Sequence, residues 1–237
     1  MHLSVIIPAY NEEKRLPKTL KAVGGYLERQ SYDSEILVVD SSSTDKTFEL
    51  AQSLVSEIKN LRVMRVANKG KGYAVRQGML RAIGDFRLFM DADNATSVDQ
   101  VEKMWPEVQA GYELIIGSRD IKGAVIAVAQ PWWRRRLGDV FNLIVQVCSG
   151  LFGIWDTQCG FKGFAKKTAE DIFSKALING WAFDVELLIL ARKFGYKIKE
   201  IPVTWVNDPH SKVKLKGMIQ MLLEVFQIRW NLIRKKI

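Results

Sequence analysis

Two acidic residues, one position apart, follow a mostly apolar segment in the first half of the chain. Asp91 and Asp93 come directly after residues 86–90. Two carboxylates at this spacing can offer oxygen ligands to a hard divalent cation such as Mg²⁺ or Mn²⁺. Such a cation would bridge the phosphates of a nucleotide diphosphate and neutralise a leaving group. A D-x-D pattern alone arises easily by chance, so its position after a strand-like segment is what favours the metal interpretation over a helix cap.

Polar loops also follow two earlier apolar runs. Residues 8–12 (PAYNE) follow the run 3–7, and residues 40–45 (DSSSTD) follow the run 35–39. In open parallel sheets, ligands bind outside the carboxyl ends of the strands, so we expect the three acidic loops to converge on one edge. At that edge Asp40 or Glu12 could accept hydrogen bonds from a base or a ribose.

Several other ligand-binding motifs are missing from the sequence. The glycines beside Lys71 do not complete G-x-G-x-x-G, no Walker A motif occurs, and His2 and His210 are too few for a zinc motif. The P-loop and dehydrogenase classes are therefore excluded. Cys159 has no candidate base near it in sequence, which favours a small buried hydrophobe over a nucleophile.

The elements that must position these loops alternate along the chain. Segments of helical period separate five runs rich in Val and Ile, and we expect buried strands at 3–7, 35–39, 62–66, 86–90 and 113–116. Asn11 is the expected N-cap of the first helix, and Ser43 or Thr44 that of the second. Repeated strand, helix, strand units predict an α/β fold, with a mostly parallel sheet and helices on both faces over about the first 120 residues.

After Arg119 the pattern becomes mainly helical. We predict a long helix at 132–152, a glycine-broken stretch at 157–164, two shorter helices, a strand at 197–204 and a final helix from Val213. No linker is apparent, so residues 1–237 are interpreted as a single domain with halves 1–120 and 121–237.

Composition excludes further classes. The 237 residues are 48% apolar and carry a formal net charge of +9, which is unlike collagen, disordered chains and disulfide scaffolds. A chain of this length can bury a sizeable core without disulfides, so two cysteines favour a reducing compartment.

The longest stretch without charge, 140–155, is shorter than the roughly 20 residues of a spanning helix. With no secretion signal recognised, we expect a cytoplasmic protein or one on the cytosolic face of a membrane.

The second half carries two amphipathic patterns. The first follows Trp132, Trp133 and the arginines 134–136, and its apolar residues are Val140, Phe141, Ile144, Val147, Cys148 and Leu151. The second lies in the basic segment 205–237, and its apolar residues are Met218, Met221, Leu222, Val225, Phe226, Trp230 and Ile233. Aromatic and basic residues together suit a lipid headgroup boundary, where each Lys or Arg is worth about 1 kcal/mol. The alternative is that both helices cover the sheet and pack on each other.

Several segments, in order, resemble motifs of the family 2 inverting glycosyltransferases of the GT-A fold. They are residues 5–12 (VIIPAYNE), 38–40 (VVD), 68–72 (NKGKG), 91–96 (DADNAT) and 117–119 (GSR). Later segments resemble the branch of dolichyl-phosphate glucosyltransferases, to which dolichyl-phosphate mannose synthases are close relatives. These are residues 156–162 (DTQCGFK), 181–188 (WAFDVELL) and 200–203 (EIPV).

The resemblance implies roles for matching positions. The residues implied to line the nucleotide pocket are Pro8, Tyr10, Glu12, Asp40, Lys71, Asp91 and Ala92. Asp91 and Asp93 would hold the metal and the donor diphosphate. The residues implied around the donor and acceptor phosphates are Arg119, Lys162, Ser211 and Lys212. Asp93, Arg119 and Asp156 form the expected catalytic set, with Asp156 orienting the acceptor. The family usually has a second acid after Asp40, where this chain has Ser41, so this loop does not identify the base.

The activity implied is metal-dependent, inverting transfer of a hexose, glucose from UDP-glucose, to a polyprenyl phosphate such as dolichyl phosphate. Residues 1–120 would bind the nucleotide sugar, and 121–237 would face the acceptor and the membrane. A phosphate monoester is mostly dianionic at neutral pH and needs no strong general base. Mannose transfer from GDP-mannose, a different acceptor, or a non-catalytic module that binds a nucleotide sugar or a membrane remain as alternatives. Nucleic-acid binding is not expected, because no such motif accompanies the basic residues.

Overall fold

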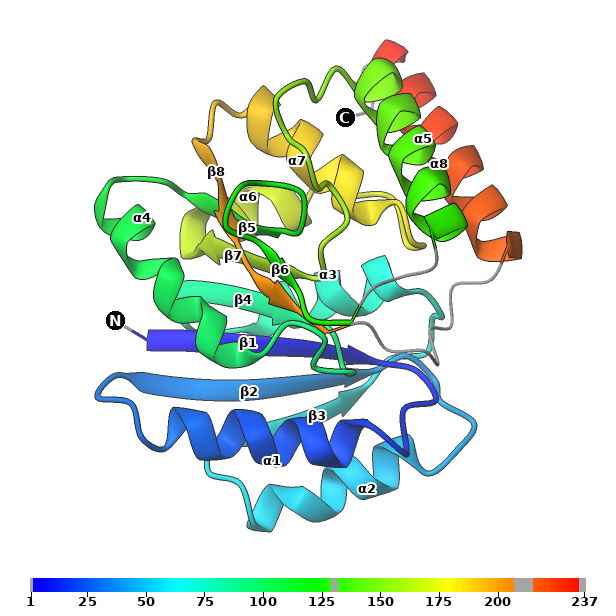
Figure 1. The fold of residues 1–237 in the computed structure, drawn as a ribbon. Helices are drawn as coiled ribbons and strands as arrows, with labels where there is room; N and C mark the ends of the chain where they lie inside the picture. Colours follow the sequence, from blue (N-terminus) through cyan, green and yellow to red (C-terminus); the bar gives the residue numbers. More distant parts are fainter. Residues whose placement is uncertain (1, 129–131, 207–214, 235–237) are drawn as a thin grey trace.

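A seven-stranded sheet runs through the centre of the computed structural model, which describes residues 2–128, 132–206 and 215–234. The strand order is β3-β2-β1-β4-β7-β5-β8 (Figure 1). The strands are β1 (His2–Ala9), β2 (Asp33–Asp40), β3 (Leu61–Arg65), β4 (Phe86–Met90), β5 (Leu114–Ser118), β7 (Phe161–Ala165) and β8 (Ile198–Pro202). β6 (Val125–Ile126) and β9 (Thr204–Trp205) form a separate parallel pair next to the end of β8.

The predicted strands agree with β1 to β5 to within two residues at each end. β3, β2, β1 and β4 pair in parallel, as do β5 and β8. The exception is β7, which runs antiparallel between β4 and β5. Gly163 permits this pairing, because a Cβ there would lie 2.4 Å from the Phe86 ring. The predicted mostly parallel α/β class is confirmed.

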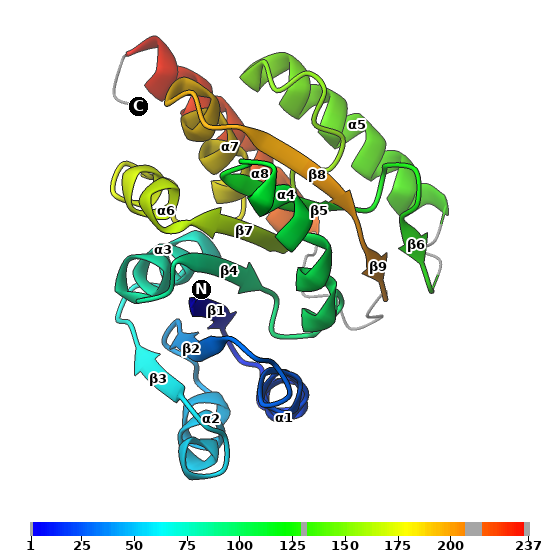
Figure 2. The same cartoon turned by 90° about the vertical axis from the view of Figure 1, so that its left-hand side faces the viewer.

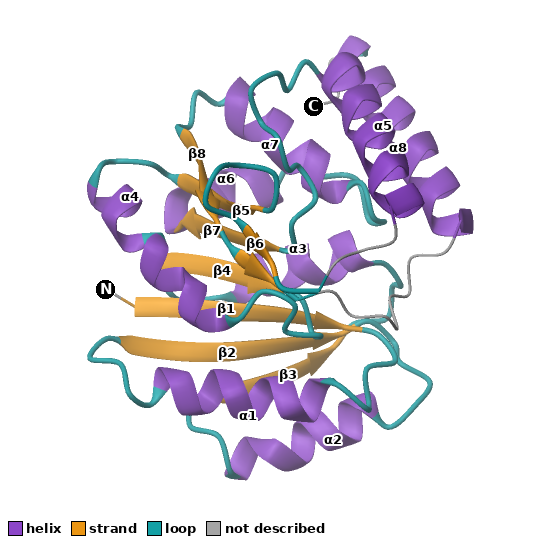
Figure 3. Cartoon of the chain, viewed as in Figure 1, coloured by secondary structure: helices purple, strands orange, loops and turns teal. Residues whose placement is uncertain are grey.

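Helices cover both faces of the sheet (Figure 3). One face packs on α1 (Leu16–Leu27), α2 (Thr47–Ser53) with the 3₁₀ turn η1 (Leu54–Ser56), η2 (Val98–Lys103) and α4 (Trp105–Gln109). The other face packs on α3 (Lys71–Arg81), α6 (Lys166–Phe173) and α7 (Phe183–Lys193). Along β1, Val5 and Ile7 belong to the first core and Ile6 to the second, as the two-residue period of a strand requires.

The loops after β1 and β2 are bonded to each other. Asn11 has a left-handed backbone, with φ of 55°, and its Oδ1 accepts from the backbone N–H of Thr44 at 2.8 Å. The Ser43 hydroxyl accepts from the backbone N–H of Asn11 at 2.9 Å. The predicted N-cap roles of these residues are wrong, because α1 begins only at Leu16 and α2 only at Thr47. Their side chains instead fasten two loops at the carboxyl edge of the sheet.

Two long helices, α5 (Trp132–Ser149) and α8 (Leu215–Ile233), pack on each other at one side of the molecule (Figures 1 and 2). Phe141 and Val145 of α5, with Val225 and Ile228 of α8, are buried in the core. A second set of apolar side chains points outward: Val140, Leu143 and Val147 of α5, and Ile219, Leu223, Phe226, Trp230 and Ile233 of α8. We call this second set the outer apolar face. Among the described residues, no helix has the length and apolar character needed to cross a membrane.

Candidate active site

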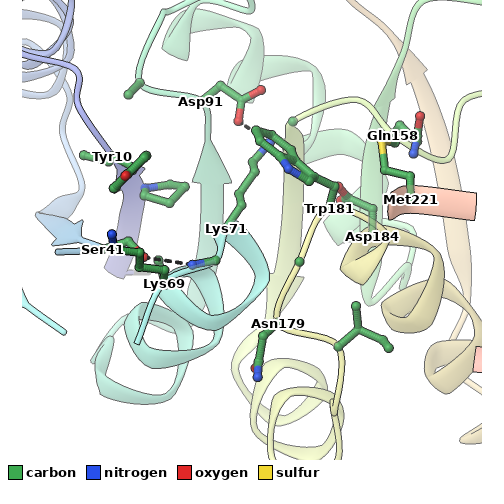
Figure 4. Close-up of a pocket in the computed structure, with 18 of the residues that line it drawn as sticks. Tyr10, Ser41, Lys69, Lys71, Asp91, Gln158, Asn179, Trp181, Asp184 and Met221 are labelled. Atoms are coloured by element: carbon green, nitrogen blue, oxygen red, sulfur yellow. Dashed lines mark hydrogen bonds and ion pairs between the residues drawn. The ribbon is translucent and has the colours of Figure 1, made fainter. Parts of the chain in front are cut away.

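A pocket of about 900 Å³ lies at the carboxyl ends of β1 and β4. Its walls come from the loops after these strands, the start of α3, the loop before β7, residues 177–181 and one face of α8 (Figure 4). Pockets of this volume hold ligands of the size of a nucleotide with an attached sugar. The antiparallel direction of β7 matters here, because residues that precede this strand reach the same edge as residues that follow β4.

The centre of the pocket holds acidic and basic side chains in contact. Lys71, the first residue of α3, places its Nζ 2.6 Å from Oδ1 of Asp91. Burial lowers the pKa of Lys71, but the charges of Asp91 and Asp184 outweigh that effect and raise it. Burial, and then the charge of Asp91, raise the pKa of the Asp93 carboxyl. Two neighbouring, half-buried carboxylates favour a bound cation.

The Asp91 carboxylate occupies space that only a glycine leaves open. A Cβ on Gly160 would lie 2.1 Å from Asp91 Oδ2, and the Gly160 carbonyl accepts from the backbone N–H of Asp91 at 3.1 Å. No group of three or more His, Cys, Asp or Glu within the described ranges could hold a metal. Asp91 and Asp93 therefore fit a cation that takes its remaining ligands from substrate phosphates and water, as Mg²⁺ commonly does.

A second charged pair lies at another part of the pocket wall. Asp156 Oδ2 accepts from Nε of Arg119 at 2.7 Å, Oδ1 accepts from Nη2 at 2.9 Å, and the Arg119 backbone N–H donates at 3.0 Å. Burial opposes ionisation of Asp156, but Arg119 prevails and lowers its pKa. The guanidinium also lies over the ring of Trp205, 5.3 Å from its centroid. Arg119 lines the pocket and Asp156 does not, so the contacts of the Asp156 carboxylate are with Arg119 and not with the pocket.

A third pair, Lys162 and Asp184, is buried behind the pocket wall. Lys162 Nζ lies 2.6 Å from Asp184 Oδ1, and their side chains are 0% and 4% exposed. The ammonium also donates to the Cys159 carbonyl at 2.6 Å. Burial raises the pKa of Asp184 despite the neighbouring Lys162 and Lys71. The expectation that Lys162 gathers around substrate phosphates is therefore corrected: its charge is satisfied internally, and only Asp184 of the pair lines the pocket.

The structure brings most of the other predicted residues together. Those that line the pocket are Pro8, Tyr10, Glu12, Lys71, Asp91, Ala92, Asp93 and Arg119. Asp40 does not, because its side chain is fully buried and its Oδ2 accepts from Nε of Arg65 at 2.7 Å; Ser41 lines the pocket instead. Ser211 and Lys212 lie outside the described residues.

The prediction for Cys159 is confirmed. The side chain is 1% exposed, and burial raises the pKa of its thiol to about 12. A thiol with this pKa is almost entirely protonated at neutral pH, so it packs as a small hydrophobe.

Sequence reasoning gave no role to the loop 177–181, which forms one wall of the pocket. Its backbone is held from three sides. The N–H groups of Gly72 and Tyr73 donate to its carbonyls, both at 3.2 Å, and Glu186 accepts from two of its N–H groups. Glu224 of α8 accepts from the N–H of Ala182 at 2.8 Å. The loop presents Trp181 to the pocket, 5.9 Å from Lys71 Nζ. Its only signal in the sequence was the motif at 181–188.

The fold and the site together define a GT-A glycosyltransferase: a mostly parallel sheet, paired carboxylates after a central strand, and a pocket across the carboxyl edge. Residues 4–173 match the family model described as glycosyl transferase family 2, and the chain belongs to this family.

Two relatives are similar over most of this chain and about three quarters of their own length. The chain is 36% identical to a dolichyl-phosphate beta-glucosyltransferase of Trichomonas vaginalis over 239 residues, which cover 96% of this chain and 73% of the relative. It is 36% identical to the dolichyl-phosphate beta-glucosyltransferase of Homo sapiens over 245 residues, 96% of this chain and 74% of that one.

Solved structures share the fold. Glucosyl-3-phosphoglycerate synthase from Mycobacterium tuberculosis, in complex with Mn²⁺ and UDP-glucose, superposes with a TM-score of 0.70 at 19% identity, covering 95% of this chain and 77% of that one. Mannosyl-3-phosphoglycerate synthase from Rubrobacter xylanophilus gives a TM-score of 0.70 at 17% identity, covering 100% and 75%. The predicted fold class and family are confirmed.

Proposed function

We propose that this glycosyltransferase transfers glucose from UDP-glucose to a polyprenyl phosphate such as dolichyl phosphate, with inversion at the anomeric carbon. The observation that carries the proposal is that one pocket is lined both by the Asp91 and Asp93 carboxylates and by the Arg119 guanidinium. The first group suits a metal-bound diphosphate, and the second suits the phosphate of an acceptor. The names of the relatives support glucose as the sugar and dolichyl phosphate as the acceptor.

The donor side of the reaction depends on Asp91, Asp93 and Lys71. The two carboxylates would hold Mg²⁺ or Mn²⁺, which when bound supplies positive charge to the leaving diphosphate. The raised pKa of Lys71 keeps its ammonium charged beside Asp91. Lys71 therefore adds a fixed positive charge at the centre of the pocket, where negative charge develops as the glycosidic bond breaks.

The acceptor side depends on Arg119. Asp156 holds this guanidinium by two hydrogen bonds and accepts a third from the Arg119 backbone N–H, so the guanidinium meets the acceptor phosphate already oriented. A phosphate oxygen then forms the new bond to the anomeric carbon while the bond from that carbon to the diphosphate oxygen breaks. The acceptor oxygen is already ionised near neutral pH, because the second pKa of a phosphate monoester is about 6. No proton has to be removed during the step.

A direct transfer assay tests the proposal. The purified protein is given radiolabelled UDP-glucose or GDP-mannose, a polyprenyl phosphate and Mg²⁺ or Mn²⁺, and the label extracted into organic solvent is counted. We expect extractable glucose that disappears with EDTA. Extractable mannose instead of glucose would support the polyprenyl phosphate acceptor and contradict glucose as the sugar. The absence of lipid-linked label from both donors would contradict the polyprenyl phosphate acceptor.

We further propose that the enzyme rests on a membrane surface through the outer apolar face of α5 and α8. Leu223 is 64% and Phe226 is 56% exposed, which is unusual for apolar side chains so close together. The exposed Arg234 stacks on Trp230, 4.4 Å from the centroid of its ring, and suits the anionic headgroups beside an inserted aromatic ring.

Replacing Leu223 and Phe226 together by serine is expected to weaken binding to anionic vesicles by at least tenfold, because burying either side chain is worth about 1.5–3 kcal/mol. Sedimentation with vesicles measures the binding. Leu80→Ser, a matched change of an exposed leucine on α3, should bind as the wild type does. Equal binding by the double variant and the wild type would show that another surface holds the membrane.

Replacing Gly160 by alanine is expected to lower transfer by about a hundredfold, the effect of moving a reacting group by about 1 Å. The added methyl group would meet Asp91 Oδ2 at 2.1 Å and displace the carboxylate. Initial rates of transfer and Mn²⁺ binding by calorimetry measure the effect. Gly25→Ala on α1, where the nearest atom to a new Cβ is 3.9 Å away, is the control. Unchanged Mn²⁺ affinity in Gly160→Ala would contradict the role given to Asp91.

A further inference from the structure

Gln158 carries a buried polar atom that the folded chain leaves unsatisfied. Its Nε2 is shielded from solvent and has no hydrogen-bond partner among the described residues, although the side chain lines the pocket. A buried donor without a partner costs about 1–3 kcal/mol, and such groups are rare in native proteins. The side chain lines the pocket, and rotation about its last torsion, which is only weakly restricted, turns this donor toward the pocket, where a substrate can supply the missing partner.

The position of Gln158 indicates which part of the substrate it meets. It lies in the short segment between Asp156, which holds Arg119, and Gly160, which packs against Asp91. The backbone N–H of Gln158 donates to Asp156 Oδ1 at 3.2 Å and fixes the main chain there. Gln158 is therefore on the stretch that joins the acceptor side of the pocket to the metal side.

Figure 4 gives the order of the groups across the pocket. Tyr10, Ser41 and Lys69 lie at one end, Asp91 and Lys71 lie in the middle, and Gln158 lies at the other end. The loops after β1 and β2 suit the nucleoside, and the middle suits the diphosphate. Since the transferred sugar lies between the diphosphate and the incoming phosphate, it falls on the side of Gln158.

We propose that Gln158 recognises the transferred hexose by a hydrogen bond from its side-chain amide to one sugar hydroxyl. An amide can both donate to and accept from a hydroxyl group. Gln158 is thus a specificity-determining residue for the donor sugar. This inference rests on the proposed function, because it needs a hexose between two phosphates.

The test compares UDP-glucose with its 2-, 3-, 4- and 6-deoxy analogues as donors for the wild type, Gln158→Ala and Gln158→Met. Methionine has a similar size, so it keeps the packing and removes the hydrogen bond. In the wild type, kcat/KM should fall about tenfold to a hundredfold for one deoxy donor. In both variants kcat/KM for UDP-glucose should fall by a similar factor, and discrimination at that one position should vanish.

Two further measurements separate sugar recognition from other roles. The affinity for UDP with Mn²⁺ should stay within twofold of the wild type, because UDP lacks the hexose. Gln109→Ala, a matched change at the exposed end of α4, should leave every value unchanged. Discrimination that survives at all four positions in the variants would overturn the proposal. So would an equal loss of UDP affinity, or a rise confined to the KM of the polyprenyl phosphate.

Failure of the proposed function has a different signature. It is seen in the wild type, which would then transfer no glucose to polyprenyl phosphate. If the wild type transfers mannose from GDP-mannose, the same comparison with deoxymannose donors tests Gln158, with the same expected loss of discrimination at one position.

Discussion

Asparagine in place of Asp93 is expected to lower glucosyl transfer by about a thousandfold, the upper end of the range for losing one group that stabilises a developing charge. The change removes one of the two carboxylates that fit a divalent cation. It should not weaken the fold. Burial and the charge of Asp91 raise the pKa of Asp93, so the folded protein disfavours the ionised form, and asparagine is a neutral group of the same shape. Transfer rates at saturating Mn²⁺ and thermal unfolding measure the two effects.

The matched control is Asp99→Asn, the same change on an exposed residue of η2, which should leave both activity and stability as in the wild type. Transfer by Asp93→Asn within tenfold of the wild-type rate would refute the metal site. A lower unfolding temperature in Asp93→Asn would show that the ionised carboxylate stabilises the fold, against the pKa argument.

Methionine in place of Lys162 is expected to lower the free energy of unfolding by about 3–5 kcal/mol, the usual cost of removing one partner of a buried ion pair. Asp184 would remain buried without the ammonium that lies 2.6 Å from it. The double variant Lys162→Met, Asp184→Asn should recover much of this loss, because no uncompensated charge remains. Urea unfolding of both proteins measures the difference.

Lys167→Met provides the comparison. Its ammonium also lies 2.6 Å from a carboxylate, that of Asp171, but its side chain is 80% exposed. Water screens this pair, so its removal should leave the free energy of unfolding unchanged within error. If Lys162→Met were as stable as Lys167→Met, Lys162 would not be the buried counter-charge that the structure gives it, and a direct role toward substrate would return.

The first half of the fold was predictable because its signals are local. Parallel strands buried on both faces give continuous runs of Val and Ile, and polar residues stand where each run stops. The pair Asp91 and Asp93 could be located this way. The direction of β7 could not be predicted, because the sequence of a short strand such as Phe161–Ala165 does not indicate which strands it pairs with. That strand brings Gly160 to Asp91, so a decisive part of the site escaped local reasoning.

The errors in the site concern charges whose partners are distant in sequence. Asp40 was expected in the pocket, but it is neutralised by Arg65, 25 residues further along. Lys162 is neutralised by Asp184, 22 residues further along. The sequence does not show whether a charged residue in a motif contacts the substrate or another side chain; only the packing of the fold does. Ion pairs between residues far apart in the chain produce no periodic pattern in the sequence.

The interpretation that α5 and α8 pack on each other is confirmed for their inner residues, and the membrane interpretation stays a prediction for the outer apolar face. The apolar residues of each helix divide between an inner set, such as Val145 and Val225, and the outer apolar face. A broad apolar face on a helix can pack on the core with one part and form a second surface with the other. The sequence shows how broad the apolar face is, but not which of its residues are buried in the core.

The order in which the chain is made sets when the pocket can exist. β1 and β4 emerge from the ribosome early, yet one wall of the pocket is a face of α8, and Glu224 of that helix holds the N–H of Ala182. A nascent chain that has completed the central sheet still lacks this wall and this hydrogen bond. The complete pocket, with all of its walls, therefore forms only after the last helix has been made and has packed.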